Sequence, residues 1–187
     1  MKVALACGGT GGHIFPGLAT AETLRQRGHD VTLWMAGKDV EHAAVKGWPG
    51  NVVTVAARGF ENVSIRAVGT VWKLVGAIRK CRGMMKSDRP EVVLAMGSYA
   101  CVGPLGAARA LDIPYVLHES NVVPGRAVSL FARRAASVAG CFEETRYYLR
   151  RREIVITGMP LRRGIVEAAA KSRGHRPADR PFTVLIM

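Results

Sequence analysis

A glycine-rich segment directly after the first apolar run constrains this chain more than any other feature. Residues 3–6 are typical of a buried strand, residues 7–13 read Cys-Gly-Gly-Thr-Gly-Gly-His, and residues 17–27 favour a helix. Pro16 stands where the first residue of that helix is expected, because its φ is fixed and it has no amide hydrogen to leave unsatisfied. Backbone amides and the positive helix end can surround an anion at such a turn. The segment therefore predicts a phosphate- or diphosphate-binding turn in a first βα unit.

Two familiar nucleotide-binding motifs do not account for this turn. A dinucleotide fingerprint needs a small residue at its last position, where this chain has Ile14, and the sequence lacks the Gly-Lys-Ser/Thr of a Walker A loop. A purely structural tight turn remains an alternative, but it needs fewer glycines than the four that flank Thr10. We therefore favour anion binding.

Short apolar runs alternate with helical patterns along most of the chain. The predicted strands cover residues 3–6, 31–35, 52–55, 92–96, 115–118, 137–139 and 154–157. The predicted helices cover residues 17–27, 40–46, 67–86, 102–110, 125–135, 143–151 and 162–170. Continuously apolar strands separated by helices are typical of a parallel sheet covered on both faces. We predict an α/β fold with a Rossmann-like, doubly wound parallel sheet, in which ligands bind beyond the carboxyl ends of the strands.

The alternating pattern stops near residue 170, so residues 1–170 are predicted to form one domain. Residues 171–181 are basic and contain Pro and Gly, which is the composition of a linker. Residues 182–187 are apolar and predict one more strand. A strand without its helix cannot form a domain, so we expect a fragment that stops at the start of a second α/β domain.

Charge and cysteine content restrict the partners. The 27 Lys and Arg residues outnumber the 14 Asp and Glu residues, and the formal net charge of +13 indicates an acidic partner. The four cysteines lack metal-ligand spacing and favour buried thiols in a reducing compartment. No metal site is expected, and therefore no glycosyl transfer through a carboxylate-held divalent ion. Residues 92–108 carry no charge, but their glycines and proline favour strand, turn and helix over a membrane span.

A second turn of small residues follows the strand predicted over residues 92–96. Gly97, Ser98 and Tyr99 lie there, at the same edge of the sheet as the first glycine turn. The two turns together can frame one diphosphate. The alternative is an ordinary βα loop that contains one tyrosine.

Polar residues close the strand predicted over residues 115–118. His118 to Asn121 provide hydrogen bonding and acid/base capacity at the same edge. Any one of them can instead cap a helix before Pro124, but three converging loops favour a functional site. His13 is a candidate general base or substrate contact, since a nearby helix N-terminus favours a neutral imidazole. A histidine that only orients the loop is the alternative.

The helix predicted over residues 67–86 has two stripes. The first is assigned to the core and consists of Leu74, Ile78, Cys81 and Met85. The second combines apolar and basic side chains and consists of Val68, Trp72, Val75, Arg79, Arg82 and Lys86. Tryptophan beside basic residues is what contact with an anionic membrane surface requires. A contact between subdomains, or a solvated basic face, is the alternative.

Four motifs in this order resemble the N-terminal domain of the MurG family, bacterial enzymes that add N-acetylglucosamine to lipid I and so make the peptidoglycan precursor lipid II. The motifs cover residues 8–13 with 15–19, 96–99, 118–121 and 158–162. Each is weak alone, and their order makes the resemblance specific over nearly the whole chain. It implies the N-terminal half of a GT-B fold, inverting transfer to the acceptor's 4-hydroxyl, and no cofactor.

The resemblance also implies roles for individual residues. On the UDP-N-acetylglucosamine side it places Thr10, Gly11, Gly12, Asn121 and Arg162. Near the acceptor diphosphate and muramyl sugar it places Gly9, Gly97, Ser98, Tyr99 and His118. His13 is the candidate base, and Glu119 is a second candidate catalytic residue. The stripe that contains Trp72 matches the family's membrane-association patch, which implies a peripheral protein on the cytoplasmic face of the bacterial cell membrane.

Three positions depart from the family's usual residues: Ser98 replaces Gly, Ser120 replaces Gln, and Met159 replaces Asn. Because the second domain's donor-binding residues are missing, we expect that the fragment alone transfers no sugar. The partners expected are UDP-N-acetylglucosamine, lipid I and an anionic inner-membrane surface, not nucleic acid. The competing functions are another GT-B glycosyltransferase with a different acceptor, and a non-catalytic basic module that binds lipid or nucleic acid.

Overall fold

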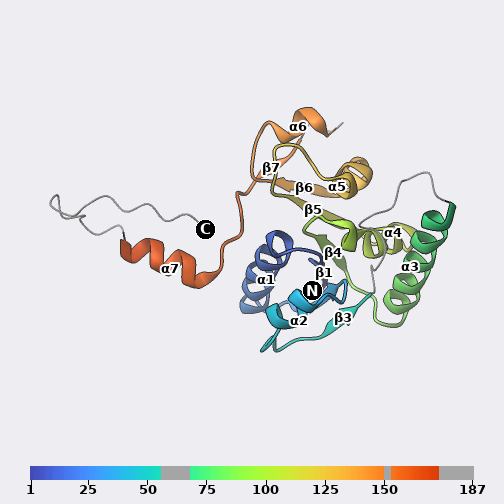
Figure 1. The fold of residues 1–187 in the computed structure, drawn as a ribbon, viewed down its shortest axis with the longest axis horizontal. Coiled ribbons are helices and arrows are strands. Elements are labelled where there is room, and N and C mark those ends of the chain that lie inside the picture. The colour runs from blue at the N-terminus through green and yellow to red at the C-terminus, as the bar shows by residue number, and fades with distance from the viewer. Residues whose placement is uncertain (56–67, 150–152, 173–187) are drawn as a thin grey trace.

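Seven parallel strands form one sheet in the computed structural model, which describes residues 1–55, 68–149 and 153–172 (Figure 1). The strands are β1 (Lys2–Ala6), β2 (Asp30–Met35), β3 (Val52–Thr54), β4 (Val92–Ala95), β5 (Tyr115–Glu119), β6 (Ser137–Gly140) and β7 (Val155–Ile156). The helices are α1 (Gly11–Gln26), α2 (Asp39–Ala44), α3 (Val68–Ser87), α4 (Val102–Ala110), α5 (Arg126–Phe131), α6 (Thr145–Tyr148) and α7 (Arg163–Ser172), with 3₁₀ turns at Tyr99–Cys101 and Ala132–Arg134.

The strand order is β3-β2-β1-β4-β5-β6-β7. Val3 pairs with Val31 of β2 on one side and with Val92 of β4 on the other, so the winding direction reverses at β1. Reversal of this kind opens a crevice at the carboxyl ends of the strands, where α/β proteins bind ligands. The predicted α/β class and the doubly wound parallel sheet are confirmed.

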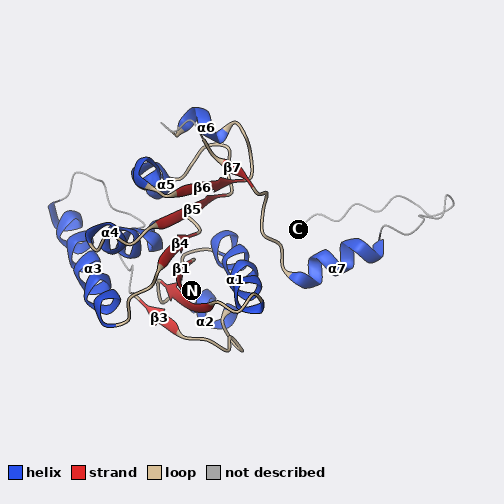
Figure 2. Cartoon of the chain, turned by 180° about the vertical axis from the view of Figure 1, so that it is seen from behind, coloured by secondary structure: helices blue, strands red, loops and turns tan. Residues whose placement is uncertain are grey.

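Helices cover both faces of the sheet (Figure 2). A separate hydrophobic core lies on each face. On one face α1 packs through buried side chains such as Ile14 and Leu18. On the other face α3, α4 and α5 bury residues that include Met85, Leu105 and Phe131. Alternate residues along each strand serve the two cores, since Leu33 belongs to the first and Trp34 to the second. The central strands are therefore mainly apolar on both faces, as the sequence pattern predicted.

The core stripe predicted for the helix over residues 67–86 is confirmed. Cys81 and Met85 are fully buried. A Cβ added at Gly106 of α4 would lie 2.6 Å from Ile78, and one at Gly103 would lie 3.0 Å from Cys81 Sγ. These two glycines therefore let α4 approach α3 closely. Cys7 and Cys81 are buried thiols, as predicted, and burial raises the pKa of both.

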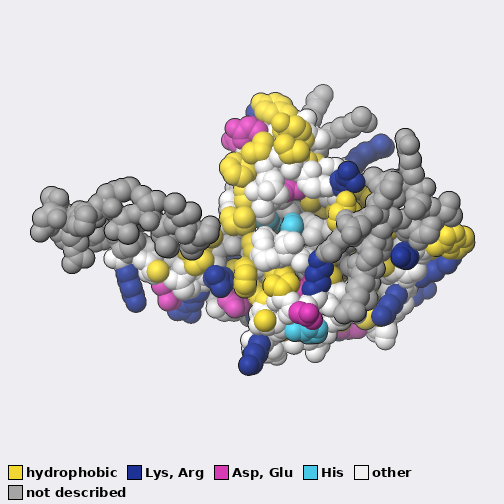
Figure 3. Space-filling view, in the orientation of Figure 1, with side chains coloured by type: hydrophobic (Ala, Val, Ile, Leu, Met, Phe, Trp, Pro, Cys, Tyr) yellow, Lys and Arg dark blue, Asp and Glu magenta, His cyan; other side chains and the backbone are white. Residues whose placement is uncertain are grey.

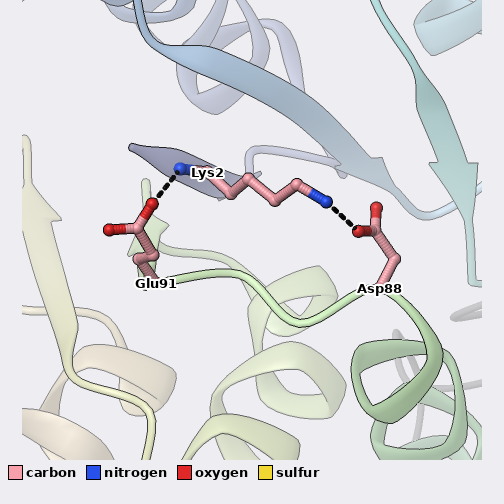
Figure 4. A network of polar contacts seen from close by, with 3 residues as sticks. All are labelled: Lys2, Asp88 and Glu91. Carbon is pink, nitrogen blue, oxygen red and sulfur yellow. Dashed lines mark hydrogen bonds and ion pairs between the residues drawn. The ribbon is translucent and has the colours of Figure 1, made fainter.

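The amino ends of the strands carry a small polar network on the opposite edge (Figure 4). The Lys2 amide donates to Glu91 Oε1 at 2.8 Å, and Lys2 Nζ lies 2.5 Å from Asp88 Oδ1. Both partners of the ion pair are more than half exposed, so the pair adds little to stability.

The start of α1 differs from the prediction. The helix begins at Gly11 instead of residue 17, so Pro16 lies inside it and His13 lies in its first turn. The Thr10 carbonyl accepts hydrogen bonds from the amides of His13 and Ile14, both at 3.0 Å. These bonds close a first helical turn that includes Gly11 and Gly12. The fixed φ of proline is close to that of a helix, but at this position the helix gives up one backbone hydrogen bond and the ring crowds the carbonyl of the preceding turn.

The chain leaves the sheet through β7 and continues into α7, which lies away from the strands (Figure 1). This helix extends to Ser172, so the linker predicted from residue 171 begins inside it. The rest of that linker and the strand predicted over residues 182–187 lie outside the described residues. Among the residues that the structure describes, no helix has both the length and the apolar character needed to cross a bilayer.

The close contact of α1 with β1 gives a stability prediction. A Cβ at Gly17 would lie 2.3 Å from Cys7 Cβ, whereas one at Gly76 of α3 would meet nothing within 4 Å. Gly17→Ala should lower the free energy of unfolding by about 1–3 kcal/mol through overpacking. Gly76→Ala should raise it by about 0.5–1 kcal/mol through backbone entropy. Urea denaturation of both variants measures the difference, and the same sign for both would contradict the packing.

Candidate functional site

Three loops meet at the carboxyl edge of the sheet, after β1, β4 and β5. The Ser98 hydroxyl donates to the Gly8 carbonyl at 2.6 Å. A Cβ at Gly97 would lie 3.1 Å from Cδ2 of His13. The carboxylate of Glu119 is close enough to act on the charge of His13. The structure therefore brings together the three segments that the sequence singled out, and Figure 3 shows histidine side chains near the centre of this view, flanked by apolar ones.

A buried glutamate that the sequence analysis missed holds the glycine turn. Glu41 Oε1 accepts the Gly9 amide at 2.7 Å, and Oε2 accepts the amides of Gly37 and Lys38 at 2.6 and 3.2 Å. Its side chain is 2% exposed. The Gly9 amide thus points to the protein, and Gly9 has a φ of +113° that favours glycine. Within the described ranges, the amides of Gly11 and Gly12 at the start of α1 have no protein acceptor.

His13 is partly buried beside this turn. Its Nδ1 lies 2.9 Å from the Thr10 hydroxyl, and the two share a hydrogen bond. Burial lowers the pKa of His13 below its ordinary value, the negative charge of Glu119 opposes this effect, and His118 adds to it. The sequence analysis expected a neutral imidazole at pH 7 because of the nearby helix end. In the structure, the main cause of the lowered pKa is burial. Such an imidazole can accept a proton.

Gly97 and Ser98 form the second turn, and both have positive φ values, of 88° and 68°. With a ψ of 164°, Ser98 occupies a region that is essentially restricted to glycine. Its hydroxyl compensates through two hydrogen bonds, because it donates to the Gly8 carbonyl and accepts the Ala100 amide at 3.2 Å. The hydroxyl of Ser98 thus links the second turn to the first, at the position where the resemblance leads us to expect glycine. Tyr99 follows and is 45% exposed at this edge.

Glu119 organises the third loop. Its Oε1 accepts the Asn121 amide and side-chain Nδ2 at 2.9 and 3.0 Å, and its Oε2 accepts the Gly125 amide at 2.8 Å. The side chain is 4% exposed, whereas Asn121 is exposed. Both carboxylate oxygens are therefore engaged in holding the loop that presents Asn121.

His118 faces the end of the sheet. Its Nε2 donates to the Gly158 carbonyl at 3.1 Å, and its side chain is 4% exposed. Its Nδ1 is buried and has no hydrogen-bond partner within the described residues. Gly158 has a φ of +69° and begins the segment that returns toward α1. His118 thus fixes the start of that segment.

Arg162 ends the same segment and returns to the first turn. Its guanidinium lies over the Phe15 ring, 4.5 Å from the ring centroid. A Cβ at Gly11 would lie 3.3 Å from the same ring, so Phe15 contacts both Arg162 and the start of α1. The exposed guanidinium adds positive charge to an edge that already presents backbone donors.

The second stripe of α3 lies on the outside of the molecule. Trp72 is 67% exposed, and Arg79, Arg82 and Lys86 are exposed, while Val75 is half-buried. The side chain of Val68, predicted as part of this stripe, lies outside the described part. Figure 3 shows Lys and Arg side chains (dark blue) over the side where Figure 1 shows α3.

Over the same described ranges, no group of three His, Cys, Asp or Glu residues could hold a metal ion.

Comparison with protein families gives one clear match. Residues 3–140 match the model of the glycosyltransferase family 28 N-terminal domain. The chain is 34% identical over 190 residues to the UDP-N-acetylglucosamine--N-acetylmuramyl-(pentapeptide) pyrophosphoryl-undecaprenol N-acetylglucosamine transferase of Geobacter sulfurreducens, with 100% of this chain and 52% of the relative covered. A relative of the same name from Rhizobium rhizogenes is 35% identical, with 98% and 49% covered. The chain thus spans about half the length of the curated relatives it matches.

Solved structures show the same fold. The crystal structure of Acinetobacter baumannii MurG superposes with a TM-score of 0.75 at 28% identity, covering 96% of this chain and 50% of that one. A UDP-GlcNAc 2-epimerase from Neisseria meningitidis superposes with a TM-score of 0.67 at 13% identity, covering 93% and 50%. The second likeness shows the fold alone.

The backbone at Ser98 gives a prediction in which the usual order of alanine and glycine is reversed. Ser98→Ala loses both hydroxyl bonds and keeps the positive φ, whereas Ser98→Gly loses the bonds and relieves the strain, which is worth about 1–3 kcal/mol. Ser98→Gly should therefore unfold at a higher urea concentration than Ser98→Ala. At Ser129 in α5 the alanine variant should be the more stable of the pair, by about 1 kcal/mol. Equal stabilities at position 98 would contradict the backbone described.

Proposed function

Because the chain belongs to the glycosyltransferase family 28 N-terminal domain family, we propose that it is the acceptor-binding half of an N-acetylglucosaminyltransferase. The reaction moves N-acetylglucosamine from UDP-N-acetylglucosamine to the 4-hydroxyl of the muramyl sugar of lipid I and yields lipid II. One observation carries the proposal: free amides at Gly11 and Gly12 lie beside a neutral His13 where three loops meet. The names of the Geobacter and Rhizobium relatives support this choice of substrates.

His13 acts as the general base in this mechanism. In the tautomer with its proton on Nδ1, that nitrogen donates to Thr10 and Nε2 keeps a free lone pair. Nε2 takes the proton of the acceptor hydroxyl while the oxygen attacks C1 of the donor sugar. The bond between C1 and the UDP oxygen breaks, UDP leaves as an anion, and the configuration at C1 inverts. Gly97 leaves room beside the imidazole, since a Cβ there would lie 3.3 Å from Nε2.

The remaining site residues bind and orient the substrates. The backbone of the first and second turns, at Gly97, Ser98 and Gly9, lies around the acceptor diphosphate, with the Gly9 amide itself held by Glu41. Tyr99 lies at the muramyl sugar, and His118 supports this side of the site through its hydrogen bond to Gly158. Thr10, Gly11 and Gly12 line the side that faces the donor. Asn121 and Arg162 reach the nucleotide-sugar, and Arg162 is held beside that turn by Phe15. Glu119 acts by positioning Asn121, because both its oxygens accept hydrogen bonds from the loop.

Transfer needs a second half like that of the relatives, because the chain spans only about half of their length. Residues 1–170 provide the acceptor domain, and the chain after the end of α7 at Ser172 leads toward the donor domain. The protein works at the cytoplasmic face of the cell membrane, where the α3 stripe contacts anionic lipid.

A transfer assay tests this function. The chain is joined to the second half of the Geobacter sulfurreducens relative and supplied with labelled UDP-N-acetylglucosamine and a short-chain lipid I analogue. We expect lipid II from the joined protein and none from the 187-residue chain alone. His13→Ala should lower kcat by at least ~100-fold, because general-base help is lost, whereas His42→Ala on the exposed side of α2 should leave it unchanged. Loss of less than about twofold in His13→Ala would rule out the base.

The pH dependence of the same assay follows from the pKa of His13. The free base is needed, and burial lowers its pKa from the ordinary value of 6.5. As the pH is lowered, the rate with subsaturating acceptor should therefore stay constant through pH 6.5. It should decrease only when the pH reaches the lowered pKa of His13, where the imidazole becomes protonated. An acid limb centred above pH 6.5 would contradict the assigned environment of His13.

Vesicle binding tests the membrane contact. Trp72→Ala, and separately the pair Arg79→Gln and Arg82→Gln, should weaken binding to phosphatidylglycerol-containing vesicles by about tenfold or more, since each basic residue near such a surface contributes about 1 kcal/mol. The matched controls are Tyr147→Ala, an exposed aromatic residue on α6, and the pair Arg133→Gln and Arg134→Gln. Equal losses in the controls would show general charge attraction in place of a defined face.

A further inference from the structure

We propose that Glu41 is a positioning residue for the diphosphate-binding turn, an inference that rests on the proposed function. Glu41 lies on α2 and is 2% exposed, so it acts through the turn and not by direct contact with a ligand. Its carboxylate accepts the Gly9 amide with one oxygen and the amides of Gly37 and Lys38 with the other. It therefore joins the loop after β1 to the loop after β2, on the side of β1 away from β4.

The first turn is shaped around this carboxylate. A Cβ at Gly8 would lie 2.7 Å from Glu41 Oε1 and 2.6 Å from the Ala36 amide nitrogen, so only glycine leaves room there. Gly9 then adopts its φ of +113° with its amide directed at Oε1. Once Gly9 is held, the chain turns into α1, where the Gly11 and Gly12 amides have no protein acceptor among the described residues. The carboxylate thus sets which amides face a ligand and which face the protein.

A carboxylate beside an anion site also has an electrostatic cost, because like charges repel. Three amide donors around Glu41 compensate its charge, and its 2% exposure keeps it behind the turn. A neutral side chain would avoid the repulsion altogether. Glutamine cannot replace it, however, since its NH2 group is a donor and one of the two loops would meet a donor in place of an acceptor. The hydrogen bonds that the two Glu41 oxygens accept from both loops offset the repulsion between Glu41 and a bound anion.

Amide hydrogen exchange and pyrophosphate binding, followed by NMR on the 187-residue chain, test the inference. In Glu41→Gln the Gly9 amide should exchange about 10- to 100-fold faster, as expected for loss of a hydrogen bond to a charged acceptor. The Kd for inorganic pyrophosphate, read from the shifts of the Gly11 and Gly12 amides at constant salt, should rise about tenfold. Glu41→Asp, which keeps the charge but is one methylene shorter, should show the same two changes.

Two controls separate positioning from general effects. Glu22→Gln removes a charge from the exposed side of α1, and Ile113→Val mildly weakens the core. Neither should change the Gly9 exchange rate or the pyrophosphate Kd. Thermal unfolding of each variant shows whether Kd follows global stability instead.

The outcomes distinguish the inference from the proposed function. Wild-type chain that binds no pyrophosphate at Gly11 and Gly12 would count against the proposed function, and the positioning role would fall with it. Wild-type binding that is unchanged in Glu41→Gln would overturn the positioning role alone. Unchanged Gly9 exchange in Glu41→Gln would do the same. Unfolding of both Glu41 variants would overturn it too, because Glu41 would then be a residue of general stability.

Discussion

Parallel pairing of β1 with β2 on one side and β4 on the other is the constraint on which the rest of the structure depends. Parallel strands place all of their carboxyl ends at one edge, so the loops after β1, β4 and β5 must meet there. The winding also reverses at β1, which keeps the helices from covering the edge at that point. Residues far apart in the chain, such as Gly8 and Ser98, are hydrogen-bonded for this reason alone.

Two buried carboxylates, Glu41 and Glu119, hold different loops at this edge. Glu41 accepts three backbone amides from the loops after β1 and β2, and Glu119 accepts donors only from the loop after β5. Buried carboxylates need such donors, because an unsatisfied charge in the interior is costly. Their hydrogen bonds leave the amides at the start of α1 as donors without a protein acceptor in the described residues. An edge with fixed carboxylates behind it and free amides in front is suited to an anionic ligand.

The sheet was predictable because its signals are local. Each apolar run lies within a few residues of the observed strand, since strands covered on both faces are mainly apolar. The predicted start of α1 was wrong, because the preference of proline for a first helical position does not exclude the earlier turn that the Thr10 carbonyl closes with the amides of His13 and Ile14. Glu41 was missed because its partner, Gly9, is 32 residues away and no spacing rule links them.

The partners of His118 and Arg162 were beyond prediction for the same reason. Gly158 lies 40 residues after His118, and Phe15 lies on a different element from Arg162. Motifs identified the residue types at this edge, whereas long-range packing decides which of them face a ligand. His118, for example, was expected beside the acceptor and directs its Nε2 to a backbone carbonyl.

The lowered pKa of His13 matters most when the proposed substrate is bound. A diphosphate brings negative charge close to the imidazole, and negative charge favours the protonated form. Glu119 already acts in this direction. Burial favours the neutral form, and in the free protein its effect on the pKa is larger than that of Glu119. A histidine that started from its ordinary pKa would be driven toward imidazolium on binding and lose its lone pair. Burial beside the first glycine turn opposes that change, which links the packing of α1 against β1 to the chemistry at its end.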